Sequence, residues 1–222
     1  MQRLEFAPAV GRPLRILAIG CHSDDIEIGC GGTILSAIAE RDDVEVVWVV
    51  LSALGPRRDE AEQGAAAMLE GASHSEVLLG EFPDGYLPYR GEDVKRFFET
   101  LTQGPAPDVI FTHQRADLHQ DHRLACELTW NTFRDHLILE YEIPKWDGDL
   151  GTPNVFVPLA RPILDRKLEI VTATFASQRN KGWFTEDLFT GLTRLRGMEC
   201  RSESGHAEAF FGRKLRLDVG LN

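Results

Sequence analysis

The sequence has little basic charge. Its 24 lysine and arginine residues are outnumbered by 35 aspartate and glutamate residues, so the formal net charge is −11. Binding to nucleic-acid phosphates needs a basic surface, and this balance argues against nucleic acid as a partner. The same charge disfavours binding to anionic membrane surfaces.

Long hydrophobic runs are also missing. The longest apolar stretch, VVWVVLSAL at residues 46–54, is far too short to span a bilayer. The first twenty residues, MQRLEFAPAVGRPLRILAIG, lack the uninterrupted apolar core and cleavage site of a signal peptide. We therefore expect no membrane span and no secretion signal.

Cysteine is scarce and unpatterned. The four cysteines form no CxxC pair and have no regular spacing, and they are Cys21, Cys30, Cys126 and Cys200. This usage is typical of free thiols in a reducing compartment, which predicts a cytoplasmic protein.

Short apolar runs and helical segments alternate along the chain. We predict strands at residues 15–20, 44–51, 75–80, 107–113, 137–143 and 154–159, and an extended segment at 207–217. Helices are predicted at residues 33–43, 57–71, 92–103, 122–135 and 161–178. Buried strands alternating with helices are typical of a parallel sheet covered on both faces. The sequence predicts a Rossmann-like, doubly wound α/β fold with a mostly parallel sheet, as one domain over residues 1–222.

Ionisable side chains cluster where two of these strands end. The stretch AIGCHSDDIEIGCGGTIL at residues 18–35 contains His22, Asp24 and Asp25. The fourth strand ends at His113 and continues into QRADLHQDHR, whose ionisable residues include Asp117, His119, Asp121 and His122. In open α/β sheets ligands bind beyond the carboxyl ends of the strands. We expect both clusters at the same edge.

A bound cation would compensate the charge of these side chains. His22 and Asp25 are three residues apart, so a turn can direct both at one ion, and the second cluster supplies further ligands. Two imidazoles and one carboxylate are a common catalytic zinc set that leaves one position for water. Zinc lowers the pKa of such a water to about 7. Asp24 is then the adjacent carboxylate able to take its proton.

Structural roles compete with this interpretation. The aspartates could cap helices or form turns, and Asp121 could cap the helix that begins at His122. The GCGG cluster at residues 29–32 does not match the dinucleotide-binding spacing, which would need glycine where Ile34 stands. We expect these glycines to form a tight loop and to allow close packing at the start of the next helix. Whether His113, Asp117 and His206 line the pocket stays open.

The two clusters resemble the motifs of a known family. HSDDIEIGCGGT is similar to the HPDD…GGT signature of the PIG-L/LmbE-like metal-dependent N-deacetylases, and DLHQDHR is similar to their D-x-H-x-D-H motif. The segments RRDEAEQGAAAMLEG, FPDGYL, KLEIVTATFASQ and GHAEAFF match further family segments, so the resemblance covers nearly the whole chain. Two positions depart from it: Ser23 replaces the usual proline, and Cys21 the usual alanine, with its side chain expected to point away from the site.

The resemblance implies a ligand set and a mechanism. The metal ligands would be His22, Asp25 and His122, holding zinc or another divalent metal such as Fe²⁺. Asp24 would be the general base. His119 would stabilise the tetrahedral intermediate and protonate the leaving amine.

The resemblance also implies supporting and substrate-binding roles. Asp121 would orient His119. Arg57 and Asp84 would bind substrate hydroxyls, although the neighbouring Arg58 leaves the choice of arginine open.

The predicted function is therefore a zinc-dependent hydrolase that removes an N-acetyl group from an amino sugar or glycoconjugate. Two alternatives stay open: an amidohydrolase that uses the same site on a small non-sugar amide, and a non-catalytic metal- or ligand-binding domain. The sequence does not identify the sugar, the native metal or whether the protein forms a homo-oligomer.

Overall fold

The computed structural model describes residues 2–6, 8 and 11–216. Its strands are β1 (Leu14–Gly20), β2 (Val44–Val50), β3 (His74–Leu79), β4 (Val109–His113), β5 (Leu137–Tyr141), β6 (Val155–Pro158) and β7 (Ala207–Gly212). Its α-helices are α1 (Asp25–Gly29), α2 (Gly31–Glu40), α3 (Pro56–Met68), α4 (Gly91–Thr100), α5 (Gln120–Thr132), α6 (Arg161–Thr174) and α7 (Glu186–Cys200). Two short 3₁₀ helices are η1 (Leu87–Arg90) and η2 (Ala176–Gln178).

Within the described residues the strands form one seven-stranded sheet in the order β3-β2-β1-β4-β5-β7-β6. The strands β1 to β5 pair in parallel, whereas β7 is antiparallel to its neighbours β5 and β6. The predicted mostly parallel sheet is confirmed. The chain order reverses between β1 and β4, and this switch point is where such sheets bind ligands.

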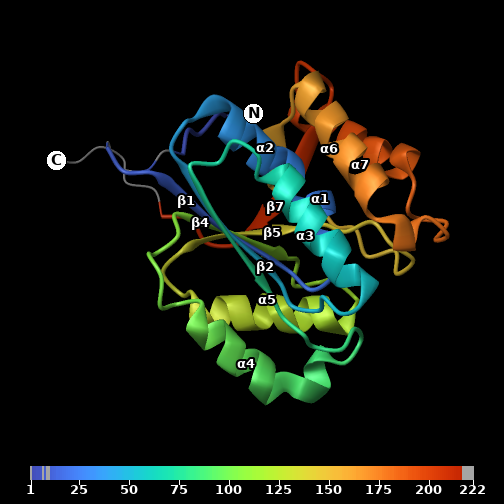
Figure 1. The fold of residues 1–222 in the computed structure, drawn as a ribbon. Helices are drawn as coiled ribbons and strands as arrows, with labels where there is room; N and C mark the ends of the chain where they lie inside the picture. The colour runs from blue at the N-terminus through green and yellow to red at the C-terminus, as the bar shows by residue number, and fades with distance from the viewer. Residues whose placement is uncertain (1, 7, 9–10, 217–222) are drawn as a thin grey trace.

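Helices cover both faces of the sheet (Figure 1), with α4 and α5 on one face and the other α-helices on the opposite face. The strand β1 shows how one short sequence fills both cores. Ile16 and Ala18 belong to one buried cluster, and Ile19 and the following Cys21 belong to the other. Successive side chains of a strand point to opposite faces, so a continuous apolar run suits a strand that is buried on both sides.

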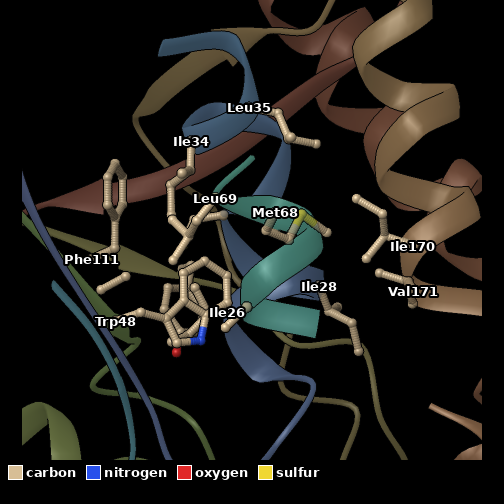
Figure 2. Close-up of a cluster of buried hydrophobic side chains, with 14 of the residues drawn as sticks. Ile26, Ile28, Ile34, Leu35, Trp48, Met68, Leu69, Phe111, Ile170 and Val171 are labelled. Atoms are coloured by element: carbon tan, nitrogen blue, oxygen red, sulfur yellow. The ribbon is translucent and has the colours of Figure 1, made fainter. Parts of the chain in front are cut away.

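The larger core lies beneath α2, α3 and α6. Figure 2 shows Trp48 of β2 and Phe111 of β4 near Ile34 of α2 and Met68 of α3, with Ile170 of α6 farther out. Burying an aliphatic or aromatic side chain of this kind contributes about 1.5–3 kcal/mol. This packing holds α1, which begins with Asp25, and α3, which carries Arg57.

The glycine cluster forms helices where a loop is predicted. Residues 25–29 form the short helix α1, and α2 begins two residues later, after a break at Cys30. A Cβ atom on Gly29 would lie 2.3 Å from the ring of Tyr141. One on Gly32 would lie 2.7 Å from Leu159. Glycine at these positions therefore permits the close packing that the sequence predicts, within helices.

The C-terminal third differs most from the predicted elements. The helix predicted over 161–178 ends at Thr174, because the buried Phe175 leaves the helical path and a 3₁₀ turn follows. The helix α7 lies where no element is predicted, and Thr185 caps it by accepting the Leu188 N–H at 3.3 Å. The extended segment predicted over 207–217 forms a strand that ends at Gly212, and residue 217 lies outside the described residues.

Membrane-spanning helices are not found in the described part of the chain, where none of the helices is both long and apolar enough to cross a bilayer.

Candidate metal site

The two predicted clusters meet at the carboxyl ends of β1 and β4. Three side-chain donor atoms lie together there: Nδ1 of His22, Oδ2 of Asp25 and Nε2 of His122. The two nitrogens are 3.2 Å apart, and the Asp25 oxygen lies 3.3 Å from His22 and 3.6 Å from His122. His22 follows β1, Asp25 begins α1, and His122 is in the first turn of α5.

This geometry fits one tetrahedral cation. Ligand atoms bound to zinc at about 2.0–2.1 Å lie about 3.3–3.4 Å apart when the angles are tetrahedral. The three observed separations of 3.2, 3.3 and 3.6 Å bracket that value. The donor set of two imidazoles and one carboxylate also suits a divalent transition metal.

Each of the two histidines is held by an aspartate at its other ring nitrogen. Nδ1 of His122 lies 2.9 Å from Oδ2 of Asp117, and Nε2 of His22 lies 3.3 Å from Oδ2 of Asp121. A histidine that donates one N–H to a carboxylate has its other nitrogen free as a ligand, with its tautomer and ring orientation set. Asp117, whose role the sequence leaves open, and Asp121 therefore lie behind the ligands.

The resemblance implies that Asp121 orients His119, but the carboxylate of Asp121 lies against His22. The Asp121 carboxylate also accepts the backbone N–H groups of Gly85 at 2.7 Å and Leu87 at 3.1 Å. Its backbone N–H donates to Nδ1 of His119 at 3.3 Å, so the two residues interact through the main chain. His119 has an extended backbone conformation, whereas Asp121 lies in the first turn of α5, so the two side chains point in different directions.

His119 is the N-cap residue of α5 and stands beside both histidine ligands. Its ring centroid is 5.0 Å from that of His22 and 4.6 Å from that of His122. Burial and the neighbouring His22 lower the pKa of His119. Because Nδ1 accepts a hydrogen bond, a neutral His119 carries its proton on Nε2.

Asp24 lies between His22 and Asp25 in sequence and is buried. Its two carboxylate oxygens differ in their hydrogen bonds. Oδ1 accepts a hydrogen bond from Arg57 at 2.8 Å, whereas Oδ2 has no hydrogen-bond partner among the described residues. Burial raises the pKa of Asp24, and the Arg57 guanidinium opposes that rise. Arg58 instead pairs with Glu62 and Glu81 on the exposed side of α3. Of the two arginines, Arg57 is the one at the site.

Asp84 reaches the site from the loop after β3. Its Oδ1 lies 3.0 Å from Nε2 of His22, although 74% of its side chain is exposed. The hydrogen bond from His22 lowers the pKa of Asp84 to about 2. Asp84 is therefore an ionised group at the open side of the cluster.

His113 and Lys145 lie behind the ligands. The buried ring of His113 stacks on His122 at a centroid distance of 3.8 Å, and its Nε2 is 3.2 Å from Oδ2 of Asp25. Lys145 donates to Asp117 at 3.0 Å. Lys145 is not among the predicted site residues, because it lies in the irregular loop after β5 and no motif marks it.

Cys21 and His206 are two further residues that the sequence analysis considers near the site. Sγ of Cys21 lies within 4.8 Å of ligand atoms of Asp25 and His113, so its side chain is nearer the site than predicted, although it packs in an apolar cluster. His206 contacts Thr193 of α7 at 3.2 Å. All four cysteines are free thiols.

Fold and site together define a class: a doubly wound α/β protein with a buried histidine and aspartate cluster, suited to a metal, at the switch point of the sheet. The family model of PIG-L, described as GlcNAc-PI de-N-acetylase, matches residues 17–133. This match covers more than half of the 222 residues, and the chain belongs to the PIG-L family.

The chain is also similar to a curated relative and to a solved structure of the same fold. The uncharacterized deacetylase YaiS of Escherichia coli is 31% identical over 140 residues, which are 59% of this chain and 74% of YaiS. The conserved protein TT1542 of Thermus thermophilus has a TM-score of 0.70 at 22% identity, covering 94% of this chain and 99% of TT1542.

Two solved enzymes share the fold. The N,N′-diacetylchitobiose deacetylase of Pyrococcus horikoshii, bound to an inhibitor, has a TM-score of 0.64 at 20% identity, covering 88% of this chain and 82% of that one. The 4-carboxy-2-hydroxymuconate hydratase GalB of Pseudomonas putida has a TM-score of 0.66 at 19% identity, covering 94% of this chain and all of GalB. These likenesses show the fold alone, and a fold shared by a deacetylase and a hydratase does not by itself define a reaction.

Proposed function

We propose that this protein is a divalent-metal-dependent N-deacetylase that acts on N-acetylated amino sugars or their conjugates. The observation that carries the proposal is the trio of His22 Nδ1, Asp25 Oδ2 and His122 Nε2, mutually 3.2–3.6 Å apart. Membership of a deacetylase family supports the reaction type. Zinc is the metal that the donor set favours, and Fe²⁺ is the alternative.

Two side chains flank the ligands in positions suited to amide hydrolysis. A divalent cation at these ligands supplies a Lewis acid that polarises the acetyl carbonyl and lowers the pKa of water. Asp24 offers its unpartnered Oδ2 as the general base. His119 carries a proton on Nε2, with which it hydrogen-bonds the developing oxyanion, while the proton that Asp24 takes from the water passes to the leaving nitrogen.

The surroundings of the site suit a hydroxylated ring that carries a further group. Asp84 has an ionised carboxylate that can accept hydrogen bonds from substrate hydroxyls. Two large side chains, Tyr86 and Leu118, are 60% and 57% exposed. They lie within two residues of Asp84 and His119 in sequence, so a group attached to the sugar has apolar surface to cover. The named substrate of the diacetylchitobiose deacetylase is also an acetylated sugar.

Metal analysis tests the ligand set. His22→Ala, Asp25→Ala and His122→Ala should each deplete the metal of the purified protein, because the number of ligands sets the affinity. His74→Ala is the matched control, since His74 is exposed at the start of β3. Full occupancy in all three ligand variants would overturn the assignment.

Kinetics of two further variants test the catalytic roles. Asp24→Asn should retain metal and lose about 10²–10⁴ in kcat, the usual scale of general acid–base catalysis. His119→Ala should lower kcat with little change in KM, because it acts in the transition state. A rise in KM alone would instead make His119 a substrate-binding residue.

A substrate panel separates the remaining functions. Free-amine release should be faster from N-acetylglucosamine than from acetyl-lysine, because a site built to bind hydroxyls rejects analogues without them. Aryl or alkyl glycosides of N-acetylglucosamine should be better still, since remote binding energy can act at the reacting centre. A preference for acetyl-lysine or a simple acetamide would refute the sugar assignment while the metal mechanism could survive. Absence of turnover with every amide, in metal-loaded protein, would favour a non-catalytic binding domain or a different reaction.

A further inference from the structure

The Arg57 guanidinium is already engaged on the protein side of the site. Its Nη2 donates to Oδ1 of Asp24 at 2.8 Å, and its Nη1 lies 3.1 Å from Oγ of Ser177 and 3.4 Å from Oε2 of Glu60. Only 22% of its side chain is exposed. The family resemblance implies a hydroxyl-binding arginine here, whereas these three contacts hold it against a carboxylate of the protein.

Glu60 and Ser177 form a clamp around this guanidinium. Glu60 lies in α3, one turn after Arg57, and Ser177 lies in η2, the 3₁₀ turn after α6. Oε1 of Glu60 accepts the Ser177 N–H at 2.8 Å, and Oε2 accepts the Ser177 hydroxyl at 2.6 Å. Glu60 is only 9% exposed. The hydrogen bonds between Glu60 and Ser177 thus join α3 to η2 beside the Arg57 side chain.

The clamp determines which oxygen of Asp24 is free. A carboxylate can turn about its terminal bond, and a fixed bond to one oxygen sets the direction of the other. Oδ1 is taken by Arg57, and Oδ2 is buried without a partner in the described structure. Arginine has a long, flexible stem, so further contacts are needed to keep its planar head in one place.

We propose that Glu60 and Ser177 are positioning residues for the deacetylation: they hold Arg57 against Oδ1 of Asp24 and thereby direct Oδ2 toward the reacting water. The inference rests on the proposed function, because it assigns Asp24 the role of base. In this proposal Arg57 binds Asp24 and not the substrate. Disturbing the clamp should therefore misdirect the Asp24 carboxylate and leave binding of the sugar unchanged.

Kinetics of matched variants test the clamp. Glu60→Gln and Ser177→Ala should each lower kcat by about 10–100-fold, the usual effect of removing a group that orients a catalytic one, with KM and bound metal little changed. Glu62→Gln is the control, since Glu62 is on the exposed side of α3, where it pairs with Arg58 at 3.1 Å. Activity equal to that control would overturn the proposal. A rise in KM without loss of kcat would also overturn it and place Arg57 on the substrate.

A second measurement is independent of activity. Ser177 is uncharged, so any thermodynamic coupling between Ser177→Ala and Asp24→Asn must pass through Arg57 and not through direct charge repulsion. The shifts in urea midpoint of the two variants should be non-additive in the wild-type chain and additive in an Arg57→Met background. Additive shifts in both backgrounds would refute the clamp. If wild-type protein released no amine from any N-acetyl sugar, the proposed function would fail, and this coupling would still decide whether the clamp exists.

Discussion

Replacing Lys167 of α6 by methionine tests how the segment carrying Asp25 is held in place. Lys167 Nζ donates to the Ile28 carbonyl in the last turn of α1 at 2.7 Å, and to Oε1 of Glu208 at 2.6 Å. Glu208 of β7 in turn accepts the N–H groups at the start of α2, including that of Thr33 at 2.7 Å. One buried ion pair thus joins α6 and β7 to both helices that follow the first cluster.

The expected loss of stability follows from the burial of this pair. Each side chain is 3% exposed, so a lone carboxylate left by Lys167→Met stays out of water. Removing one partner of a buried ion pair costs about 3–5 kcal/mol. Glu208 keeps its donors at α2, including the Thr33 hydroxyl at 2.6 Å, which favours the lower half of this range. At about 2–4 °C per kcal/mol for a domain of this size, about 3–4 kcal/mol corresponds to a fall of about 6–16 °C in Tm.

Thermal unfolding followed by circular dichroism measures this change. Lys95→Met is the matched control, because Lys95 is 39% exposed and its pair with Glu99 on α4 is solvated. An exposed pair contributes about 0.2–1 kcal/mol, so the control should change Tm little. Metal affinity should fall in Lys167→Met alone, since α1 begins with Asp25. A Tm for Lys167→Met equal to that of the control would refute the reasoning that this pair holds the site.

Three further predictions concern the metal site and its packing. Removing metal with a chelator should abolish amine release and lower Tm, because a ligand bound only to the folded state stabilises it, and adding zinc should restore both; an unchanged Tm and activity would contradict a bound metal. Asp117→Asn and Asp121→Asn should each weaken metal binding by about 10–100-fold, measured by competition with a chromophoric chelator, since each removes a carboxylate behind a histidine ligand. Gly29→Ala should destabilise by about 1–3 kcal/mol in urea unfolding, because its Cβ would overlap the buried Tyr141 ring, and a variant as stable as wild type would show that this ring can move.

Most of the sheet could be predicted because most of its strands are short, largely apolar runs. The strand predicted over residues 44–51 is observed at Val44–Val50, and that predicted over 75–80 at His74–Leu79. The helix α7 was missed for a physical reason. Its buried face includes Thr193 and Arg196, both 4% exposed, so the polar residues obscure the apolar period that identifies a helix. Arg196 can be buried because Glu142 pairs with it at 2.7 Å, a contact that spans 54 residues of sequence.

The sequence alone determined that the two clusters containing His22, Asp25 and His122 would meet at one edge of the sheet, and the family resemblance implied these three as ligands. They follow the ends of parallel strands, and the parallel pairing of β1 with β4 places both ends at one edge. Only the tertiary structure decided how their neighbours are used. Helix rotation directs the Asp121 carboxylate to His22 and leaves Asp117 to hold His122.

The direction of the two arginines was likewise decided by packing. Arg57 and Arg58 are adjacent and chemically identical, but about 100° of rotation along α3 separates them. Arg57 faces Asp24, and Arg58 faces the exposed Glu62. Motif spacing identifies which ionisable groups reach one edge of a sheet. The partner of each group depends on the rotation of its helix and on segments such as η2, which are distant in sequence and are brought close only by burial of the core.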